Sequence, residues 1–294
     1  MASLTPPAPR LTARQLSIVA RERMVLRRRA RVPEPMVMDE PEAVAQFDWA
    51  GAHALAPVYA LCARAMSPLL PQGGTVFDLG SGSGRYLAHL ARQRPDIRVV
   101  GLELSKTMLA LAEETLAREG VADRVTVLHG DMTECLEFMP RRVDVVSTVF
   151  ALHHLPSEEQ LTRCLAQIRA ASEGAGVFLF DLARLRNPRT WERLLRTGPQ
   201  LPDRFLADSL ASERAAWSFG EIAQAAEAAG LGGLATRREP VIGTWQMRMR
   251  GPDLPWCRAV PDPIEVADVQ GIRTCSGRAS EAGRGVPQSG RERP

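Results

Sequence analysis

The chain has 294 residues, enough for one large domain with extensions. Hydrophobic residues make up 45% and charged residues 24% of the chain, as in ordinary globular proteins, which excludes a wholly disordered chain. No apolar run approaches the ~20 residues of a membrane-spanning helix. The N-terminal segment shows no apolar signal-peptide core. We therefore expect a cytoplasmic protein without a membrane part.

The formal net charge of +3 gives little electrostatic reason to expect nucleic acid as a partner. The five cysteines are far apart and form no C-x-x-C pair, which fits neither a zinc site nor a disulfide framework. We therefore expect no metal site. For the assembly we expect a monomer or a homodimer.

Residues 1–35 form a basic arm with an arginine cluster at 27–31. Apolar residues at helical spacing predict a short helix over about 12–30, which the prolines that follow would end. The arm suits either a contact with nucleic acid or a membrane surface, or a solvated helix that packs on the domain. Charge runs are usually solvated faces, so we favour the second interpretation.

Between residues 75 and 182 the sequence alternates between strand-like and helical patterns. Apolar runs of strand length occur at 75–80, 98–104, 125–131, 143–150 and 176–182. Helical patterns lie between them near 84–94, 105–119 and 157–171. Continuously apolar strands are typical of a parallel sheet that helices cover on both faces.

The remaining sequence divides into three parts. Residues 183–220 are polar, arginine-rich and interrupted by prolines, so we interpret them as a lid insertion. A helix at about 219–230 with Ser218 as its N-cap follows, and then two closing strands around 234–239 and 241–249. Residues 251–294 hold many Gly and Pro but few large apolar side chains, and we expect a disordered tail. The α/β domain would therefore span residues 36–250.

The stretch DLGSGSG at 78–84 follows the first strand and opens a helix. Its glycines let a ligand approach the backbone, and the N–H groups at the helix start add partial positive charge. The second strand ends at Glu103, placed to accept hydrogen bonds from ribose hydroxyls. The third strand ends at Asp131 and Met132, beside the crevice where such folds bind nucleotides. The Asp131 carboxylate could accept a hydrogen bond from an adenine amino group.

The glycine spacing argues against a dinucleotide, whose usual fingerprint is G-x-G-x-x-G. Here the run is G-x-G-x-G, and Asp78 precedes it, which would repel a pyrophosphate. A ligand with an ammonium group, a ribose and an adenine but no phosphate fits better, and S-adenosylmethionine (SAM) is such a ligand. A nicotinamide-dependent oxidoreductase is therefore disfavoured.

The motifs DLGSGSG, GLELS (101–105), GDM (130–132) and STVFALHHL (147–155) resemble the successive cofactor motifs of class I SAM-dependent methyltransferases. The resemblance covers about residues 70–182 and extends with the last helix and strands to about 250. It implies a Rossmann-like, doubly wound seven-stranded sheet whose last strand is antiparallel. The segments at 33–48 and 208–231 resemble uncharacterised small-molecule members.

The resemblance also implies a role for each motif residue. Asp78 would engage the methionine ammonium, Glu103 the ribose hydroxyls and Asp131 the adenine edge. Phe150 would lie near the sulfonium, or serve only as a core residue. The implied cofactor-binding residues are Asp78, Gly80, Ser81, Gly82, Gly84, Glu103, Leu104, Asp131, Met132 and Phe150.

A base that takes the acceptor's proton would come from His153 or His154, after the fourth strand, or from Asp181, at the end of the fifth. A structural role for these residues stays open, because HHL recurs in relatives with different chemistry. Trp191 and Trp217 flank the lid and either line an acceptor pocket or are simply buried.

The leading hypothesis is SAM-dependent methyl transfer to a small-molecule acceptor by in-line displacement. One alternative is an RNA or protein methyltransferase. Against it, TVFALHHLP lacks the Asn/Asp-Pro-Pro-Tyr/Phe quartet of the amino-group methylases. The other alternative is a protein that binds SAM without turnover.

Overall fold

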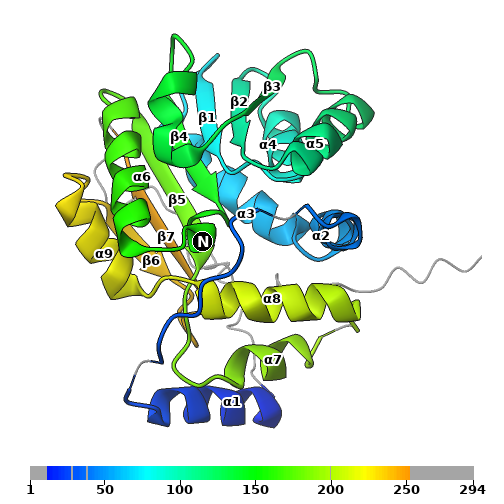
Figure 1. The fold of residues 1–294 in the computed structure, drawn as a ribbon, viewed down its shortest axis with the longest axis vertical. Coiled ribbons are helices and arrows are strands. Elements are labelled where there is room, and N and C mark those ends of the chain that lie inside the picture. The colour runs from blue at the N-terminus through cyan, green and yellow to red at the C-terminus, as the bar shows by residue number, and fades with distance from the viewer. Residues whose placement is uncertain (1–11, 28, 38, 199, 252–294) are drawn as a thin grey trace, which may run out of the picture.

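A seven-stranded sheet runs through the centre of the computed structural model, which describes residues 12–27, 29–37, 39–198 and 200–251 (Figure 1). The strand order is β3–β2–β1–β4–β5–β7–β6. The strands are β1 (Thr75–Leu79), β2 (Arg98–Glu103), β3 (Val125–His129), β4 (Val145–Val149), β5 (Gly176–Leu182), β6 (Ala235–Arg238) and β7 (Trp245–Arg250). The last strand, β7, runs antiparallel to both of its neighbours, β5 and β6, whereas the other strand pairs are parallel. This confirms the predicted fold class.

Helices cover both faces of the sheet, as its continuously buried central strands require. One face packs against α3 (Ala56–Met66), α4 (Arg85–Gln93) and α5 (Lys106–Arg118). The other packs against α6 (Glu158–Ala171) and α9 (Phe219–Ala228). Ser218 caps α9 as predicted: its hydroxyl accepts the N–H of Glu221, whose carboxylate accepts the N–H of Ser218.

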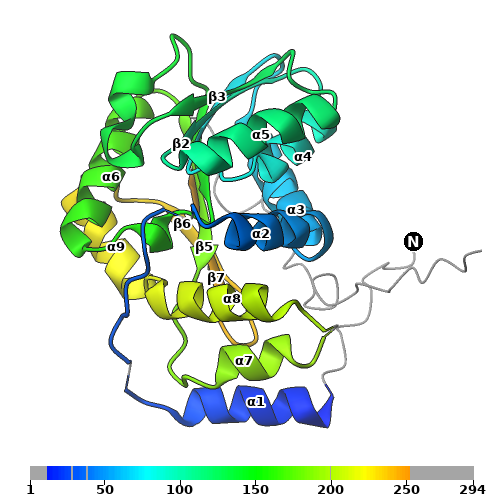
Figure 2. The same cartoon turned by 45° about the vertical axis from the view of Figure 1, so that its right-hand side comes forward.

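A layer of helices lies beyond the carboxyl edge of the sheet (Figure 2). It contains α1 (Ala13–Met24), α7 (Thr190–Leu195) and α8 (Asp203–Ala215), and α2 (Pro41–His53) connects it to the main body. The buried carboxylate of Glu22 accepts hydrogen bonds from the backbone of Arg186 and Asn187 and from the hydroxyl of Thr190. The N-terminal helix is thereby tied to the segment predicted as a lid.

The predicted helix over 12–30 is too long, because α1 ends at Met24. Two arginines of the basic cluster explain the extended path that follows. Arg29 pairs with the buried Glu213. The Arg31 guanidinium stacks on Trp217, 3.7 Å from its ring centroid, and donates to backbone carbonyls of His153, Leu155, Pro156 and Ala215. These charges hold the chain to the domain.

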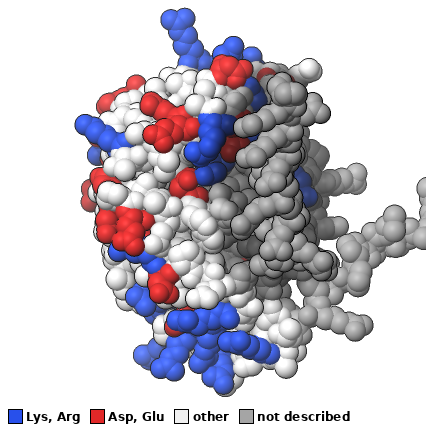
Figure 3. Space-filling view, turned by 90° about the vertical axis from the view of Figure 1, so that its right-hand side faces the viewer, with Lys and Arg blue, Asp and Glu red and all other residues white. Residues whose placement is uncertain are grey.

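Helix α1 has three exposed arginines, Arg14, Arg21 and Arg23. This helix lies at the end of the molecule where Figure 3 shows a cluster of basic side chains. No helix among the described residues is long and apolar enough to cross a membrane. The sequence patterns predicted neither α2 nor α3. The predicted tail, apart from Gly251, lies outside the described residues.

Arg31→Ala should lower the free energy of unfolding by about 2–4 kcal/mol, because it leaves buried carbonyls without donors. Burial lowers the pKa of Arg31 to about 10. Urea denaturation measures the change. Arg27→Ala, at an exposed position, is the matched control and should lie within about 0.5 kcal/mol of wild type. Equal stabilities of the two variants would contradict the anchoring role.

Candidate active site

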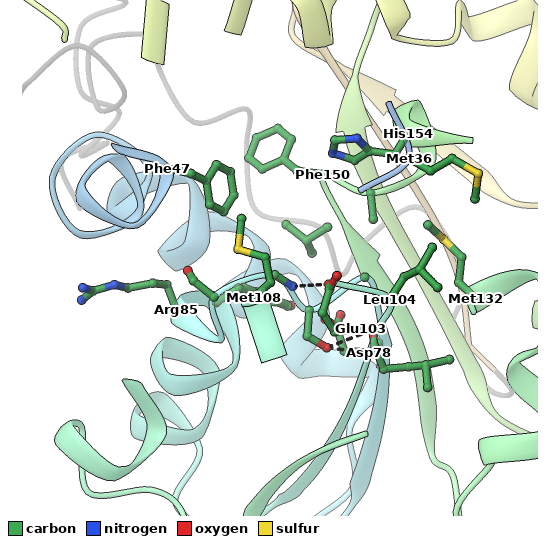
Figure 4. Close-up of a pocket in the computed structure, with 18 of the residues that line it drawn as sticks. Met36, Phe47, Asp78, Arg85, Glu103, Leu104, Met108, Met132, Phe150 and His154 are labelled. Carbon is green, nitrogen blue, oxygen red and sulfur yellow. Dashed lines mark hydrogen bonds between the residues drawn. The ribbon is translucent and has the colours of Figure 1, made fainter. Parts of the chain in front are cut away.

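A cavity opens at the carboxyl ends of β1 to β4, and Figure 4 shows the side chains around it. It is formed by the loops after these strands together with residues of α2, α3 and α5. Nine of the ten predicted cofactor residues line it: Asp78, Gly80, Ser81, Gly82, Glu103, Leu104, Asp131, Met132 and Phe150. Parallel strands bring these separate motifs to one edge.

Asp78 lies at the floor of this cavity, 1% exposed. Its Oδ1 accepts a hydrogen bond from the hydroxyl of Ser147, at 2.5 Å, across the β1–β4 pair. Burial raises the pKa of Asp78 to about 7, against the opposing effect of the Ser147 hydrogen bond, and the charge of Glu103 adds to the rise. A cationic group beside Asp78 would compensate the buried charge.

Backbone donors hold Glu103 at the end of β2. Its Oε2 accepts the N–H of Gly82 and its Oε1 accepts the N–H of Ser105, both at 2.8 Å. A carboxylate has about four acceptor sites, so two backbone bonds leave capacity for two hydroxyl donors. Burial raises the pKa of Glu103, and the backbone bonds oppose that rise. This arrangement suits a vicinal diol such as that of a ribose.

The glycine turn needs glycine for two reasons. Gly80 has φ of 77°, and a Cβ there would lie 2.4 Å from Cβ of Ala151. Gly84, with φ of 73°, is the N-cap of α4 and does not line the cavity, so its part in cofactor binding stays a prediction. A Cβ on Gly84 would lie 3.1 Å from Ala112, so this glycine allows α4 to pack against α5.

The loop after β3 contributes Asp131 and Met132 to the cavity wall. Asp131 caps the 3₁₀ helix η2 (Met132–Phe138), and its Oδ1 accepts the N–H of Thr133 at 2.7 Å. Leu104 and Met132 add apolar walls beside it (Figure 4). A carboxylate next to apolar side chains fits the amino edge and faces of an adenine.

Phe150 is the only described non-glycine residue with positive φ, 57°. Its ring meets Phe180 edge-on, with centroids 5.2 Å apart. Figure 4 shows Phe150 and Phe47 across the cavity from Asp78 and Glu103. Such a conformation costs of order 1–3 kcal/mol and is retained where the surroundings require it. The Phe150 side chain lines both this cavity and a second one.

The second cavity has a volume of about 290 Å³ and adjoins the first, sharing Phe47, Phe150 and His154 with it. We name it the acceptor cavity. Its wall is mainly apolar, from residues of α3, α7, α8 and the loop before β7. Trp191 lines this cavity, which agrees with the first of the two alternatives for it, a pocket-lining residue, over simple burial. Trp217 does not: it is buried and donates its indole N–H to the carbonyl of Leu152.

The two predicted histidines lie in the 3₁₀ helix η3 (Leu152–His154), at the junction of the cavities. His153 Nδ1 is 2.6 Å from Oδ1 of Asp181, and the His153 backbone N–H donates to Oδ2. Burial acts to lower the pKa of His153, but the charge and hydrogen bond of Asp181 outweigh it and raise the pKa. Asp181 lines neither cavity, and its two carboxylate oxygens contact the ring and the backbone N–H of His153. Its role in catalysis stays a prediction.

Glu34 completes this group and was not anticipated from the sequence. It comes from the extended segment after α1, and its Oε1 lies 3.4 Å from His153 Nε2 and 3.3 Å from His154 Nδ1. Burial raises the pKa of Glu34. The segment has no periodic pattern, and only its resemblance to small-molecule members could have drawn attention to it.

Residues 76–176 match the family model described as a methyltransferase domain. This matched region lies within a seven-stranded sheet whose strand order is that of the class I SAM-dependent methyltransferase fold. An O-methyltransferase family protein from Burkholderia thailandensis shares the fold, with a TM-score of 0.55 and 18% identity over 81% of this chain and 70% of that one.

Two curated relatives differ in their named activities. An aclacinomycin 10-hydroxylase from Streptomyces purpurascens is 35% identical over 108 residues, 37% of this chain and 28% of that protein. A demethylmenaquinone methyltransferase from Porphyromonas gingivalis is 27% identical over 123 residues, 41% of this chain and 48% of that protein. The chain thus spans less than half the length of these relatives.

The first cavity fits the cofactor of this family, SAM. The buried carboxylate of Asp78 suits an ammonium group, and Glu103 keeps acceptor capacity for ribose hydroxyls. The glycine turn leaves space against Ala151 that a Cβ on Gly80 would fill.

Asp78→Asn should abolish SAM binding or weaken it at least about tenfold, because an amide cannot pair with the ammonium as a carboxylate does. In wild type, Asp78 is neutral below pH about 7 and charged above it, so affinity should rise between pH 6 and 8. Calorimetry at several pH values measures both effects. The variant should lose the pH dependence and keep its melting temperature, since it avoids burying a charge. Unchanged affinity in Asp78→Asn would refute this role.

Proposed function

We propose that the protein transfers a methyl group from SAM to an apolar small molecule that binds in the acceptor cavity. The observation that carries the proposal is the junction of the two cavities at Phe47, Phe150 and His154. A cofactor held by Asp78 and Glu103 would direct its reactive end toward this junction. Proximity and alignment alone can lower a barrier by roughly 7–11 kcal/mol.

The wall of the acceptor cavity supports an acceptor with a mainly apolar body and at least one polar group. Apolar side chains form most of it, among them Leu61, Leu194 and Trp245. Ser209 and Ser212 are among its few hydroxyl groups. Small-molecule sites commonly combine an apolar wall with a few fixed polar groups.

The layer of α1, α7 and α8 closes the acceptor cavity on the side away from the sheet. Val19 of α1, Leu195 of α7 and Phe205 of α8 all line it. We propose that residues 183–220, together with α1, act as the lid that excludes water. A cavity enclosed in this way favours a small molecule over an RNA or protein acceptor.

When bound, SAM supplies a methyl group that its sulfonium already activates. The chain's own residues then align the acceptor and hold a proton. Phe150 faces both cavities and would confine the acceptor beside the reacting methyl group. Asp181 fixes the His153 ring through Nδ1, which leaves Nε2 as the atom that can take a proton. His154 reaches both cavities, and burial lowers its pKa to about 3, so it stays neutral.

We further propose a cytoplasmic location, in keeping with the buried free thiols of Cys62, Cys135 and Cys164. The monomeric or homodimeric state stays a prediction.

Incubating the full chain with methyl-labelled SAM and fractionated cell extracts tests the proposed reaction. We expect label to enter the fraction of apolar compounds below about 1 kDa and S-adenosylhomocysteine to accumulate in proportion. Label in RNA or protein would assign the acceptor to a polymer. Tight SAM binding with no product in any fraction would mean binding without turnover, and either result overturns the proposal.

Leu195→Trp should fill the acceptor cavity and lower methyl transfer at least about tenfold, while the affinity for SAM changes by less than about twofold. Leu136→Trp is the control, because Leu136 is exposed on η2 and lines neither cavity. Equal turnover in both variants would show that the acceptor binds elsewhere.

A further inference from the structure

The group formed by Glu34, His153 and His154 has a geometry that proton transfer alone does not explain. One potential ligand atom from each residue lies within 4.8 Å of the other two. The two distances from Glu34 Oε1 to imidazole nitrogens are 3.3 and 3.4 Å. Both exceed the 2.7–3.2 Å of ordinary N–H···O hydrogen bonds.

Glu34 Oε1 is buried without a hydrogen-bond partner among the described residues, although its Oε2 accepts from the hydroxyl of Ser212. The Glu34 side chain is 11% exposed and that of His153 is 4% exposed. A buried carboxylate oxygen without a partner is costly, so an arrangement that keeps one needs a compensating group. A cation between the three side chains would be that group.

The two separations from Glu34 Oε1 match metal coordination. With bonds of 2.0–2.2 Å to nitrogen and oxygen, tetrahedral ligand atoms stand about 3.3–3.6 Å apart. Two imidazoles and one carboxylate are a donor set typical of Zn²⁺ and Fe²⁺, whereas Mg²⁺ and Ca²⁺ prefer oxygen alone. We propose that Glu34, His153 and His154 bind one divalent first-row transition metal ion at the junction of the two cavities.

The surroundings of the three ligands support this site. The Asp181 carboxylate accepts a hydrogen bond from Nδ1 of His153. Carboxylates orient metal-binding histidines in this way and leave Nε2 for the ion. His154 would bind through Nδ1, in the tautomer that carries its proton on Nε2. Its 3.4 Å contact with the carbonyl oxygen of Pro35 would then not be a hydrogen bond. With neutral imidazoles, the carboxylates of Glu34 and Asp181 outweigh the single guanidinium of Arg31, so the site attracts a cation.

The ion's role rests on the proposed function, but its binding does not. His153 and His154 both line the acceptor cavity, so an open coordination position there can take an acceptor hydroxyl. A metal-bound hydroxyl loses its proton to solvent at lower pH. The resulting oxygen forms the new bond to the methyl carbon as the carbon–sulfur bond breaks, and its electron pair stays on the sulfur of S-adenosylhomocysteine. With the ion bound, Nε2 of His153 would be a ligand and could not take a proton. The ion would then take the place of His153 as the group that promotes loss of the acceptor's proton.

Calorimetric titration of chelator-treated full-length protein with Zn²⁺, without SAM or acceptor, tests the site. We expect one ion per chain in wild type, and at least about tenfold weaker binding in Glu34→Gln and His154→Ala. Asp181→Asn should weaken binding about 10–100-fold, since it removes the support of His153. His53→Ala, at an exposed histidine on α2, is the control and should bind like wild type.

Titration with Co²⁺ provides a second readout, because ligation by the histidines gives visible absorption bands that His154→Ala should lose. No stoichiometric Zn²⁺ binding by wild type, or binding by His154→Ala equal to wild type, overturns the metal site. SAM titration of the same samples keeps the two proposals separate. SAM binding without Zn²⁺ binding would overturn only the metal site, whereas Zn²⁺ binding without methyl transfer would overturn only the proposed function.

Discussion

The structure depends on acidic side chains that are fixed at the carboxyl edge of one sheet. Four parallel strands, or the loops directly after them, each contribute one such residue: Asp78, Glu103, Asp131 and Asp181. Each carboxylate accepts at least one hydrogen bond from the chain. A buried carboxylate without donors would protonate or unfold its surroundings. Because backbone N–H groups and hydroxyls satisfy part of each carboxylate, the remaining acceptor capacity is available in fixed directions for a ligand.

A segment distant in sequence also reaches this edge of the sheet. Arg31 attaches the chain after α1 to the backbone of η3, and this brings Glu34 to within 3.4 Å of both histidines. The N-terminal segment therefore contributes to the site as well as covering it. This explains why a strongly basic stretch folds inward: its arginines satisfy carbonyl groups and carboxylates that the domain would otherwise leave without donors.

The sequence was sufficient for elements whose signals are local. Most strand ends were predicted to within one or two residues, because continuous apolar runs indicate the strands and the glycine turn indicates the end of the first strand. Ser218 was identified from its position before an apolar helix. Glu34, α2 and the inward path of Arg31 were not predicted, since their roles depend on contacts with η3 and α8 that no local pattern encodes. Gly84 lies in the same glycine turn as Gly80 and Gly82 but caps α4, and spacing alone does not separate a ligand contact from a helix cap.

The central claim is that the cofactor's reactive end meets the acceptor cavity at Phe150. A crystal structure with S-adenosylhomocysteine bound measures this most directly. The account predicts the amino group beside Asp78, the ribose on Glu103 and the sulfur facing Phe150 and the acceptor cavity. A sulfur directed away from that cavity, or an adenosyl group bound outside the loops after β1 to β4, would contradict it.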